Sequence, residues 1–316
     1  LYGDLTAEKQ DEVLGPNDRR KVVLATNVAE TSITIAGITG VVDSGLARSL
    51  VFDPHVSLDR LQLLQISRAS ADQRAGRAGR TGPGVCLRLW PERTHRRRRD
   101  HDEPEVHRLD LSGPVLQLRT WGETDLAGFP WFEPPSEAAL QQAETLLRRL
   151  DALDSAGQVT PLGRAMAALP VGPRLGRMLL EGRRLGQPRA IALAAALLSE
   201  RDPFPHQVAD ASGRRTSPAP SDSDVMDRLA ALQQFEQSGR LETRLGTLHR
   251  SAARFVLHVR DQYLREMGQI PEAIAPSSSA IERERGTSGT VVDSSERADE
   301  GEAVSRALLA AFPDRL

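Results

Sequence analysis

The 316-residue chain has few of the residues on which disulfide-stapled or membrane proteins depend. Its single cysteine, Cys86, excludes an internal disulfide framework and a cysteine-rich zinc site. The apolar run around it, residues 84–90, predicts instead that Cys86 is a small core residue of a strand. No stretch reaches the roughly 20 apolar residues of a membrane helix, and the first residues lack the charged-then-apolar pattern of a secretory signal. We therefore expect a cytoplasmic protein without a membrane partner.

Lysine is almost absent as well, because Lys9 and Lys21 are the only lysines and arginine carries the remaining positive charge. The net charge of −2 argues against a protein held on nucleic acid by bulk attraction alone. Residues 68–108 nevertheless contain 11 arginines against 6 acidic residues, which favours a local basic surface. The planar fork of arginine suits phosphate recognition. A compositional bias of the whole genome would give the same arginine count, and it is the preferred explanation.

The apolar pattern of residues 1–95 is typical of an α/β layer, in which short apolar runs alternate with polar helical stretches. Three segments are predicted to be buried parallel strands: residues 21–26, 38–43 and 85–89. Residues 57–67 are predicted to be extended or a hairpin, and residues 70–80 a short helix with a glycine-rich end.

The pattern after the charged tract 96–105 is mostly helical. Ser136 is a good N-cap for a helix whose apolar face contains Leu140, Ala143, Leu147, Leu150 and Leu153. A tight turn and a short strand follow, and Pro161 begins another helix, so this stretch resembles a winged-helix unit. Further helices are predicted at residues 175–185, 189–198, 225–235, 245–267 and 303–312. Two stretches rich in Ser, Gly, Pro and charge are predicted to be disordered: residues 210–223 and 276–302.

The motif with the most specific chemistry is Gln73-Arg74-Ala75-Gly76-Arg77-Ala78-Gly79-Arg80, here called the arginine motif. Its six fixed positions would match by chance on the order of once per million windows in a chain of this composition. In phosphoryl transfer a protein mainly positions groups and stabilises negative charge on the γ-phosphate. A helix with repeated arginines, thinned by Gly and Ala, can press guanidinium groups against a nucleotide held elsewhere. Gln73 has a second interpretation, since residues 70–73 form a good capping box in which it is only a reciprocal cap.

A second polar segment, residues 25–35, directly follows the first predicted strand and is here called the Thr-Asn segment. It lies at the carboxyl edge of the predicted sheet, where α/β proteins place ligands. Alone it would be interpreted as a Ser/Thr-rich helix cap. Because the arginine motif begins 46 residues after Asn27, a ligand-contacting segment is favoured instead.

The arginine motif resembles motif VI of the superfamily 2 helicases in its DEAH-box form, and the Thr-Asn segment resembles motif V with its companion Val41–Gly45. The first ten residues resemble the motif IV region of that family. Three further segments resemble its HrpB branch in particular: residues 66–72, 83–90 and 198–203. The resemblance covers about residues 1–205 and implies an α/β RecA-like domain, a winged-helix unit and a ratchet-like α-helical bundle. We place the RecA-like domain at residues 1–95, the winged-helix unit at 104–165 and the helical bundle at 166–267. A disordered linker at 268–302 and the start of a further region at 303–316 follow.

The resemblance also implies roles for individual residues. Gln73, Arg77 and Arg80 would face the γ-phosphate of ATP. Thr26 and Asn27 would contact the backbone of the nucleic acid, while Ser32 and Thr34 would couple that contact to the nucleotide. The implied activity is ATP-driven 3′-to-5′ translocation or unwinding, with single-stranded RNA as the expected partner.

Two positions depart from the family pattern. Ala36 stands where the family usually has an acidic residue near the nucleotide, and Leu14 stands where many relatives place an aromatic side chain against adenine. Both substitutions predict weak base-specific recognition of the nucleotide.

The chain contains no Gly-x-x-x-x-Gly-Lys-Ser/Thr loop, and Asp11–Leu14 is not an Asp-Glu-x-His box. We therefore expect the protein's own N-terminal RecA-like domain to hold the β-phosphate and Mg²⁺, and the present chain alone not to hydrolyse ATP. The seven histidines show no zinc-type spacing, so no metal site is predicted. An alternative function is an ATPase-inactive scaffold that binds nucleic acid. The run Arg96–Arg99 is either a nucleic-acid contact or, preferably, a solvated linker.

Overall fold

The computed structural model describes residues 1, 5, 7–15, 19–30, 35, 37–53, 58–80, 82–204, 223–271 and 295–315. The chain divides into two compact units. Unit 1 comprises Leu1–Asp110 and Trp131–Ser136, and unit 2 comprises Leu111–Pro130 and Glu137–Leu316. No helix within the described ranges is long and apolar enough to cross a membrane.

Unit 1 has the predicted α/β pattern. Its elements are α1 (Ala7–Leu14), the 3₁₀-helix η1 (Asn27–Ala29), β1 (Gly40–Asp43), β2 (Leu46–Asp53), β3 (Leu58–Gln65), α2 (Arg68–Gly76), β4 (Val85–Arg88), α3 (Glu92–Arg96) and α4 (Glu105–Arg108). Strands β1 and β4 are parallel neighbours, and a long crossover that includes α2 joins them, as parallel pairing requires. The parallel strands predicted at 38–43 and 85–89 are present as β1 and β4, and the helix predicted at 70–80 is present as α2 but ends at Gly76.

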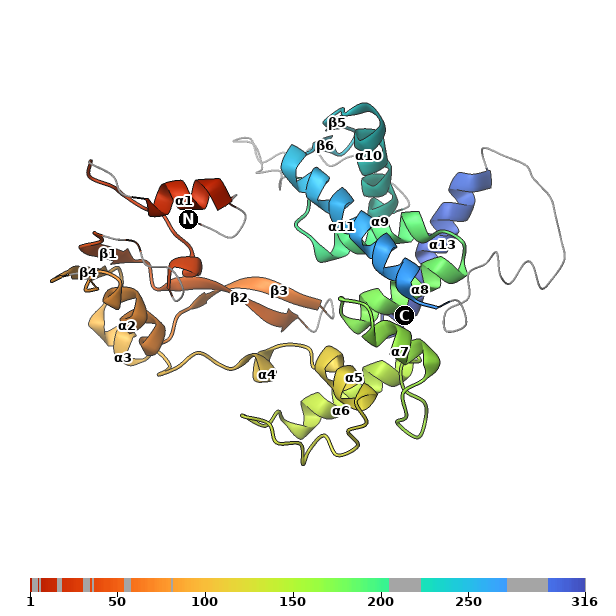
Figure 1. The fold of residues 1–316 in the computed structure, drawn as a ribbon, viewed down its shortest axis with the longest axis horizontal. Coiled ribbons are helices and arrows are strands. Elements are labelled where there is room, and N and C mark those ends of the chain that lie inside the picture. The colour runs from red at the N-terminus through yellow and green to blue at the C-terminus, as the bar shows by residue number, and fades with distance from the viewer. Residues whose placement is uncertain are drawn as a thin grey trace. The chain divides into compact units, whose positions relative to one another are not determined.

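A long hairpin interrupts that crossover. Strands β2 and β3 pair antiparallel from Leu46 opposite Gln65 to Asp53 opposite Leu58, and together they form the ribbon at the centre of Figure 1. The extended segment predicted at residues 57–67 is its second strand. The sequence analysis did not predict its first strand.

The buried strand predicted at residues 21–26 is wrong, because these residues form no strand and the side chains of Val22 and Leu24 are 81% and 84% exposed. An apolar run becomes a strand only when a neighbouring chain completes its ladder of hydrogen bonds. Among the described residues, the segment that pairs with this run is Leu1 alone, not a strand: the Thr26 N–H donates to the Leu1 carbonyl at 3.0 Å, and the Leu1 ammonium donates to the Leu24 carbonyl.

Strands β1 and β4 are also less buried than predicted, since within the described residues they form a sheet of only two strands. Val42 and Val85 are exposed, and Cys86 is half-buried instead of belonging to a core. Burial still raises the pKa of the Cys86 thiol.

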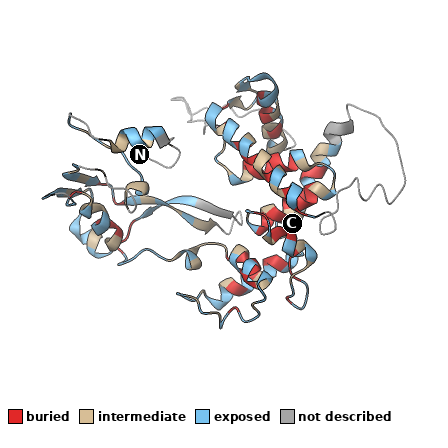
Figure 2. Ribbon diagram, viewed as in Figure 1, coloured by how far each residue is buried: buried red, intermediate tan, exposed pale blue. Residues whose placement is uncertain are grey.

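Unit 2 is a helical assembly with a continuous apolar core. Its elements are α5 (Ser112–Thr120), α6 (Glu137–Arg149), α7 (Pro161–Ala167), α8 (Pro173–Arg184), α9 (Pro188–Ser199), α10 (Asp224–Ser238), β5 (Glu242–Thr243), β6 (Gly246–Thr247), α11 (Arg250–Gln269) and α13 (Ser295–Ala311). Helix α9 lies at the centre, where every residue from Ala190 to Leu197 is buried, and it packs against α8, α11 and α13. Its run of alanines allows this close approach on several sides. Figure 2 shows the buried residues concentrated along these helices.

The winged-helix pattern of the sequence is present in unit 2. Helix α6 begins directly after Ser136 and buries the predicted face, and a single bridge then pairs Leu153 with Val159. Thr160 caps α7 by accepting a hydrogen bond from the Gly163 N–H at 2.9 Å, and Pro161 occupies the first helical position.

The two last helices differ from their predicted bounds. Helix α11 begins at Arg250, because the short β5–β6 hairpin takes up the start of the predicted helix at 245–267. Helix α13 begins at Ser295 and packs on α8, so residues 295–302 are helical where disorder was predicted. Of the predicted disordered stretches, residues 210–222 and 276–294 lie outside the described residues.

An ion pair that is buried on its arginine side attaches the end of the chain to this assembly. Arg174, at the start of α8, donates from both terminal nitrogens to the Asp314 carboxylate, at 2.7 and 2.8 Å, and also to the Ala311 carbonyl at 3.0 Å. Its guanidinium lies over the Phe312 ring. The described residues of the predicted C-terminal region, 303–315, therefore pack into unit 2.

Candidate nucleotide and nucleic-acid site

Helix α2 carries the first half of the arginine motif and begins two residues earlier than predicted, at Arg68. Ser67 is its N-cap, since its side chain accepts a hydrogen bond from the Ser70 N–H at 3.0 Å. The capping box predicted at residues 70–73 is therefore wrong, and Ser70 Oγ instead donates to Glu30 Oε1 at 2.6 Å. Gln73 lies one turn beyond the capping position and is exposed, so the capping interpretation of this glutamine does not hold.

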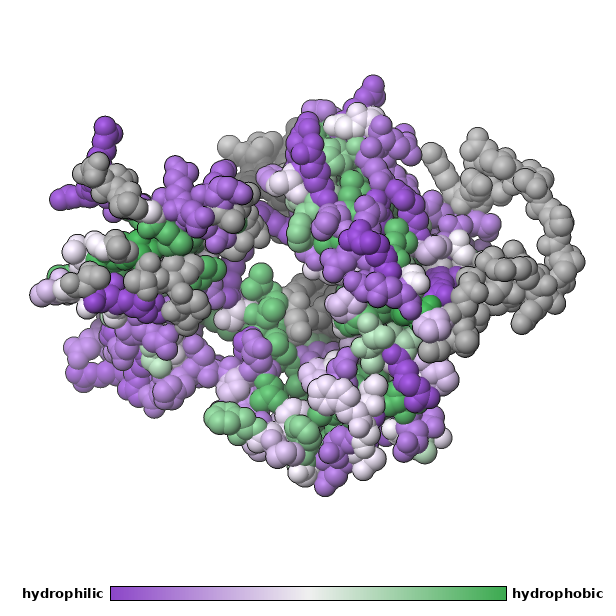
Figure 3. Space-filling view, in the orientation of Figure 1, coloured by the Kyte–Doolittle hydropathy of each residue, from purple (hydrophilic) through white to green (hydrophobic). Residues whose placement is uncertain are grey.

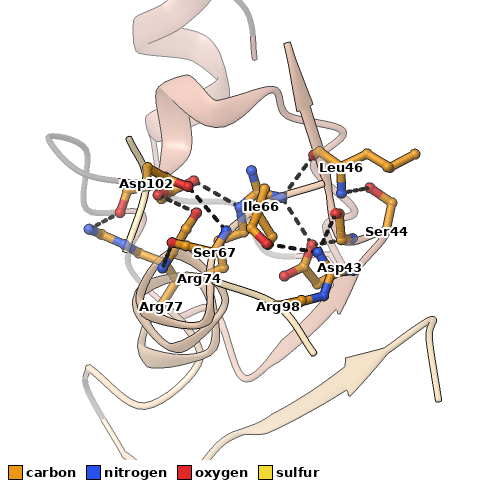
Figure 4. A network of polar contacts seen from close by, with 12 residues as sticks. Asp43, Ser44, Leu46, Ile66, Ser67, Arg74, Arg77, Arg98 and Asp102 are labelled. Atoms are coloured by element: carbon orange, nitrogen blue, oxygen red, sulfur yellow. Dashed lines mark hydrogen bonds and ion pairs between the residues drawn. The ribbon is translucent and has the colours of Figure 1, made fainter. Parts of the chain in front are cut away.

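The first arginine of the motif, Arg74, points into unit 1. Its Nε donates to Glu30 Oε2 at 2.9 Å and its terminal nitrogen to Asp43 Oδ1 at 3.0 Å, and all three side chains are at most 15% exposed. Burial alone would lower the pKa of Arg74, but the hydrogen bonds and charges of Glu30 and Asp43 raise it above its ordinary value. Figure 4 shows Arg74 and Asp43 within this polar network. Arg74 thus fixes α2 to the end of β1.

A tight turn after β1 shapes the same network. The Gly45 N–H donates to Asp43 Oδ1 at 2.9 Å, and Gly45 has a φ of +73° that favours glycine. A Cβ at this position would also come within 2.6 Å of the Trp90 ring. The turn therefore requires glycine both for its backbone conformation and for the approach of Trp90.

The remaining polar residues of the motif lie toward solvent. Gln73 and Arg80 are exposed, whereas Arg77 is half-buried, ends α2 and donates to the Glu30 carbonyl. Burial and the nearby charge of Arg80 lower the pKa of Arg77, yet an arginine stays protonated in proteins at neutral pH. Figure 3 shows hydrophilic side chains over α2 and α3. Two neighbouring guanidinium groups at the end of one helix suit a polyanion such as a triphosphate.

The Thr-Asn segment lies beside the arginine motif. Thr26 and Asn27 are exposed at the start of η1, and the Asn27 carbonyl accepts the Glu30 N–H at 2.9 Å. Glu30 in turn binds Arg74, so one short turn joins the two motifs. Ser32, Thr34 and Ala36 lie outside the described residues, whereas Leu14 is described as the half-buried last residue of α1.

Sequence reasoning missed two residues of this site, Glu30 and Arg98. Glu30 is the one carboxylate in a segment of Thr, Asn and Ser, and that contrast was the available signal. Arg98 belongs to the run Arg96–Arg99 that was interpreted as a solvated linker. That interpretation holds for Arg96 and Arg99, which pair with neighbouring glutamates, but it is wrong for Arg98, which is 8% exposed.

Unit 2 contains a separate basic surface on the first turns of α11. A shallow hollow of about 600 Å³ is lined by His249, Arg250, Ser251, Arg254, Phe255 and His258. The ring-bearing Phe255 is 54% exposed, and Arg250 and Arg254 make no hydrogen bond or ion pair with the described residues. Exposed arginines beside an exposed aromatic ring are the combination that single-stranded nucleic acids favour. Across the described ranges, no group of His, Cys, Asp and Glu side chains is arranged to hold a metal ion.

Two family models match the chain. Residues 1–82 match the helicase conserved C-terminal domain, and residues 143–171 match the winged-helix of the helicase associated domain HA2.

Curated relatives match the chain at about two-fifths identity. The human probable ATP-dependent RNA helicase DHX34 is 40% identical over 237 residues, which are 74% of this chain and 21% of that protein. The ATP-dependent RNA helicase HrpA of Escherichia coli strain K12 is 40% identical over 208 residues, 64% of this chain and 16% of that protein. The chain thus spans about a fifth of the length of these relatives.

Two solved structures of HrpB from E. coli cover the whole chain at 31% identity. One, described as a DExH-box NTPase, has a TM-score of 0.62, and the other, described as a DEAH/RHA helicase, has a TM-score of 0.67. The chain covers 32% and 33% of those proteins.

Proposed function

Because this chain belongs to the DEAH/RHA helicases as their C-terminal region, a RecA-like α/β domain followed by the HA2 winged helix and a helical region, we propose that it forms one half of an ATP-driven RNA translocase. Its arginine motif meets the γ-phosphate of a nucleotide held by an upstream RecA-like domain. Its Thr-Asn segment grips a single strand. RNA is the proposed partner because the relatives are named RNA helicases.

The division of labour within the arginine motif is the observation that carries this proposal. Arg74 is engaged by Glu30 and Asp43, which holds α2 in place. Gln73 on α2 and Arg80 in the turn after it are exposed, and Arg77 at the C-terminal cap is half-buried. A motif built only to stabilise the fold would have no reason to leave two of its fixed polar positions exposed.

ATP supplies the phosphoryl group whose transfer releases the free energy for movement. Gln73, Arg77 and Arg80 offer the donors that suit γ-phosphate oxygens, and the planar guanidinium can bind two of them at once. The chain contains no phosphate loop to cradle the β-phosphate. We therefore assign that contact, and the binding of Mg²⁺, to the upstream domain.

The single strand is assigned to two surfaces. Thr26 and Asn27 present a hydroxyl and an amide to its phosphates, and Ser32 and Thr34 couple this contact to the nucleotide. The hollow on α11 adds a second contact, in which Arg250 and Arg254 bind phosphates and Phe255 stacks on a base.

The experiment that tests the proposal is replacement of Arg80 or Arg77 by alanine in the longer protein that includes the upstream domain. Arginines that meet charge on a transferred phosphoryl group are worth roughly 10³- to 10⁵-fold in rate. Since each arginine partly covers for the other, we expect stimulated kcat to fall at least about a hundredfold, with nucleotide affinity nearly unchanged. Lysine at either position should rescue poorly because it lacks the planar fork.

Steady-state ATPase with saturating single-stranded RNA is the measurement, and thermal melting of each variant excludes misfolding. The chain of residues 1–316 alone provides the baseline and should show no stimulated turnover. A well-folded Arg80→Ala protein that keeps kcat within a few-fold of wild type would make this arginine structural and refute the assignment.

A further inference from the structure

The chain segment that follows α3 wraps around the first turn of α2. The N–H groups of Arg68 and Ala69 donate to the carbonyls of Arg99 and Asp100, each at 2.9 Å. The Ser67 N–H donates to Asp102 Oδ1 at 3.1 Å. The first N–H groups of a helix have no partner within the helix, and here a distant segment supplies three acceptors for them and for the cap.

Arg98 anchors that segment on the other side. One terminal nitrogen donates to the carbonyl of Gly45 at 3.0 Å and to that of Ile66 at 2.8 Å, and both contacts are buried. Its guanidinium lies 4.3 Å from the centre of the Trp90 ring. Arg98 therefore joins the turn after β1 to the residue that directly precedes the cap of α2 (Figure 4).

These contacts converge on the helix that carries the arginine motif. Residues 99–102 bind the N-terminus of α2 and its cap. The last turn of α2 is bound through Arg74 to Asp43, and Arg98 binds the Gly45 carbonyl in the turn that follows Asp43. The same residues 98–102 lie on the connection that leads along the chain to the winged-helix part of unit 2. A displacement of that connection would thus shift α2 as well.

We propose that Arg98 and Asp102 are positioning residues for the arginine motif, and that the connection to the winged helix controls through them where Gln73, Arg77 and Arg80 lie. The proposal rests on the catalytic function proposed above. It follows from the sensitivity of phosphoryl transfer to placement, in which an error of about 1 Å costs on the order of a hundredfold in rate. Arg98 and Asp102 themselves need not touch the nucleotide.

The first test requires no catalysis. Hydrogen–deuterium exchange of the 316-residue chain should become about tenfold faster in peptides covering α2 when Asp102 is changed to alanine. Asp102→Asn retains an acceptor for the Ser67 N–H and should exchange like wild type. Peptides covering α6 in unit 2 should be unchanged in both variants. Equal exchange of α2 in wild type and Asp102→Ala would overturn the proposal.

The second test measures stimulated ATPase in the longer protein. We expect Arg98→Ala to lower kcat about 10- to 100-fold with KM for ATP within about twofold, because placement acts on the transition state. Arg98→Lys can still donate to the two carbonyls but loses the stacking on Trp90, and should recover part of the rate. Arg93→Ala removes the same charge from an exposed position on α3 and is the matched control.

The outcomes separate this proposal from the proposed function. If Arg80→Ala abolishes turnover while Arg98→Ala and Asp102→Ala leave both kcat and α2 exchange unchanged, the positioning role is wrong and the catalytic role stands. If the exchange of α2 responds as expected but Arg80→Ala remains active, the segment positions a helix that has another function. A fall in kcat matched by an equal fall in the folded fraction would make Arg98 structural only.

Discussion

The two units of the chain maintain their structures by different means. Among the described residues, unit 1 buries 4 apolar side chains and unit 2 buries 42. Each unit also buries four polar or charged residues, so these equal the buried apolar residues in unit 1 and are about a tenth of their number in unit 2; they are Asp43, Ser67, Ser70 and Arg98 in unit 1, and Ser112, Arg174, Glu181 and Arg260 in unit 2. Figure 2 shows the same contrast, with most buried residues on the helices of unit 2. Unit 1 thus depends on a polar network to a degree that unit 2 does not.

This difference matters for function because hydrogen bonds are directional and apolar contacts are not. In unit 1 the bonds of Arg74 and Arg98 set the orientation of α2, so the contacts that stabilise the unit also place the proposed catalytic side chains. In unit 2 the residues that line the hollow on α11 are exposed and lie outside the apolar core. Stability should therefore be separable from the binding surface of unit 2 but coupled to the placement of the arginine motif in unit 1.

The largest expected effect on stability comes from the ion pair between Arg174 and Asp314 in unit 2. Changing Arg174 to alanine removes two hydrogen bonds to the partly exposed Asp314 carboxylate, and hydrogen bonds to charged groups contribute about 1.5–3 kcal/mol. We expect the melting transition of unit 2 to fall by roughly 10 °C. Differential scanning calorimetry of the chain is the measurement.

The matched control for the Arg174→Ala variant is Arg306→Ala. Arg306 and Glu302 form an ion pair on α13 in which both side chains are more than half exposed, and such pairs contribute about 0–1 kcal/mol. Equal destabilisation by the two variants would mean that Arg174 is no more important than a surface residue, and that apolar packing alone holds α13.

The second test removes the proposed RNA contact of unit 1 and leaves the hydrogen bonds of Arg74 and Arg98 in place. Thr26 and Asn27 are exposed, and their side chains take no part in the bonds of Arg74 or Arg98. Replacing both with alanine in the longer protein should weaken single-stranded RNA binding about tenfold, as expected for the loss of two phosphate contacts. Nucleotide affinity and melting temperature should stay close to wild type. Unchanged RNA binding by the double variant would remove the assignment of Thr26 and Asn27.

The sequence predicted the elements of unit 2 better than those of unit 1, for the same physical reason as the contrast above. Helix α6 has an apolar face at helical spacing, and Thr160 followed by Pro161 marks the start of α7. Such local signals suffice where apolar burial determines the fold. They failed at residues 21–26, since whether an apolar run forms a strand depends on a partner distant in the sequence.

The candidate site was predicted by motif and completed only by tertiary contacts. The motif located Gln73, Arg77 and Arg80, and their catalytic roles remain predictions. The motif could not identify Arg98, because its burial depends on Trp90 and on the absence of a side chain at Gly45. The domain boundaries and the cytoplasmic location likewise remain predictions.

A third test uses acid to weaken unit 2 through its carboxylates. Hydrogen bonds from Arg260 hold the pKa of Glu236 below its ordinary value, and the bonds from Arg184 and Arg177 outweigh burial to do the same for Glu181. A carboxyl whose pKa is depressed in the folded state stabilises the fold above its unfolded pKa, which is about 4.5 here. This stabilisation is lost as the pH falls below that value through the folded pKa.

We therefore expect the free energy of unfolding of unit 2 to decline as the pH drops below about 4.5. Glu236→Gln cannot titrate and should show a shallower decline, measured by urea unfolding from about pH 6 to about pH 3. An identical pH dependence in wild type and variant would contradict the contribution of Glu236.

The smallest expected effect concerns the hollow on α11, where substitutions should weaken RNA binding and leave the stability of unit 2 unchanged. Arg250→Ala combined with Arg254→Ala should weaken single-stranded RNA binding only a few-fold, because these contacts add to those of unit 1. Each lost phosphate contact reduces the slope of log affinity against log salt by about 0.7, so the double variant should be shallower by about 1.4. Phe255→Ala should lower affinity without changing that slope, since stacking involves no counterion release.

Arg265→Ala is the matched control: it lies on the same helix about 22 Å from Arg250 at 1.5 Å per residue and outside the hollow. Fluorescence anisotropy over a range of salt concentrations measures both quantities. If Arg265→Ala reduces the slope as much per charge as the double variant does, RNA senses only the bulk charge of unit 2, and the hollow is not a binding surface.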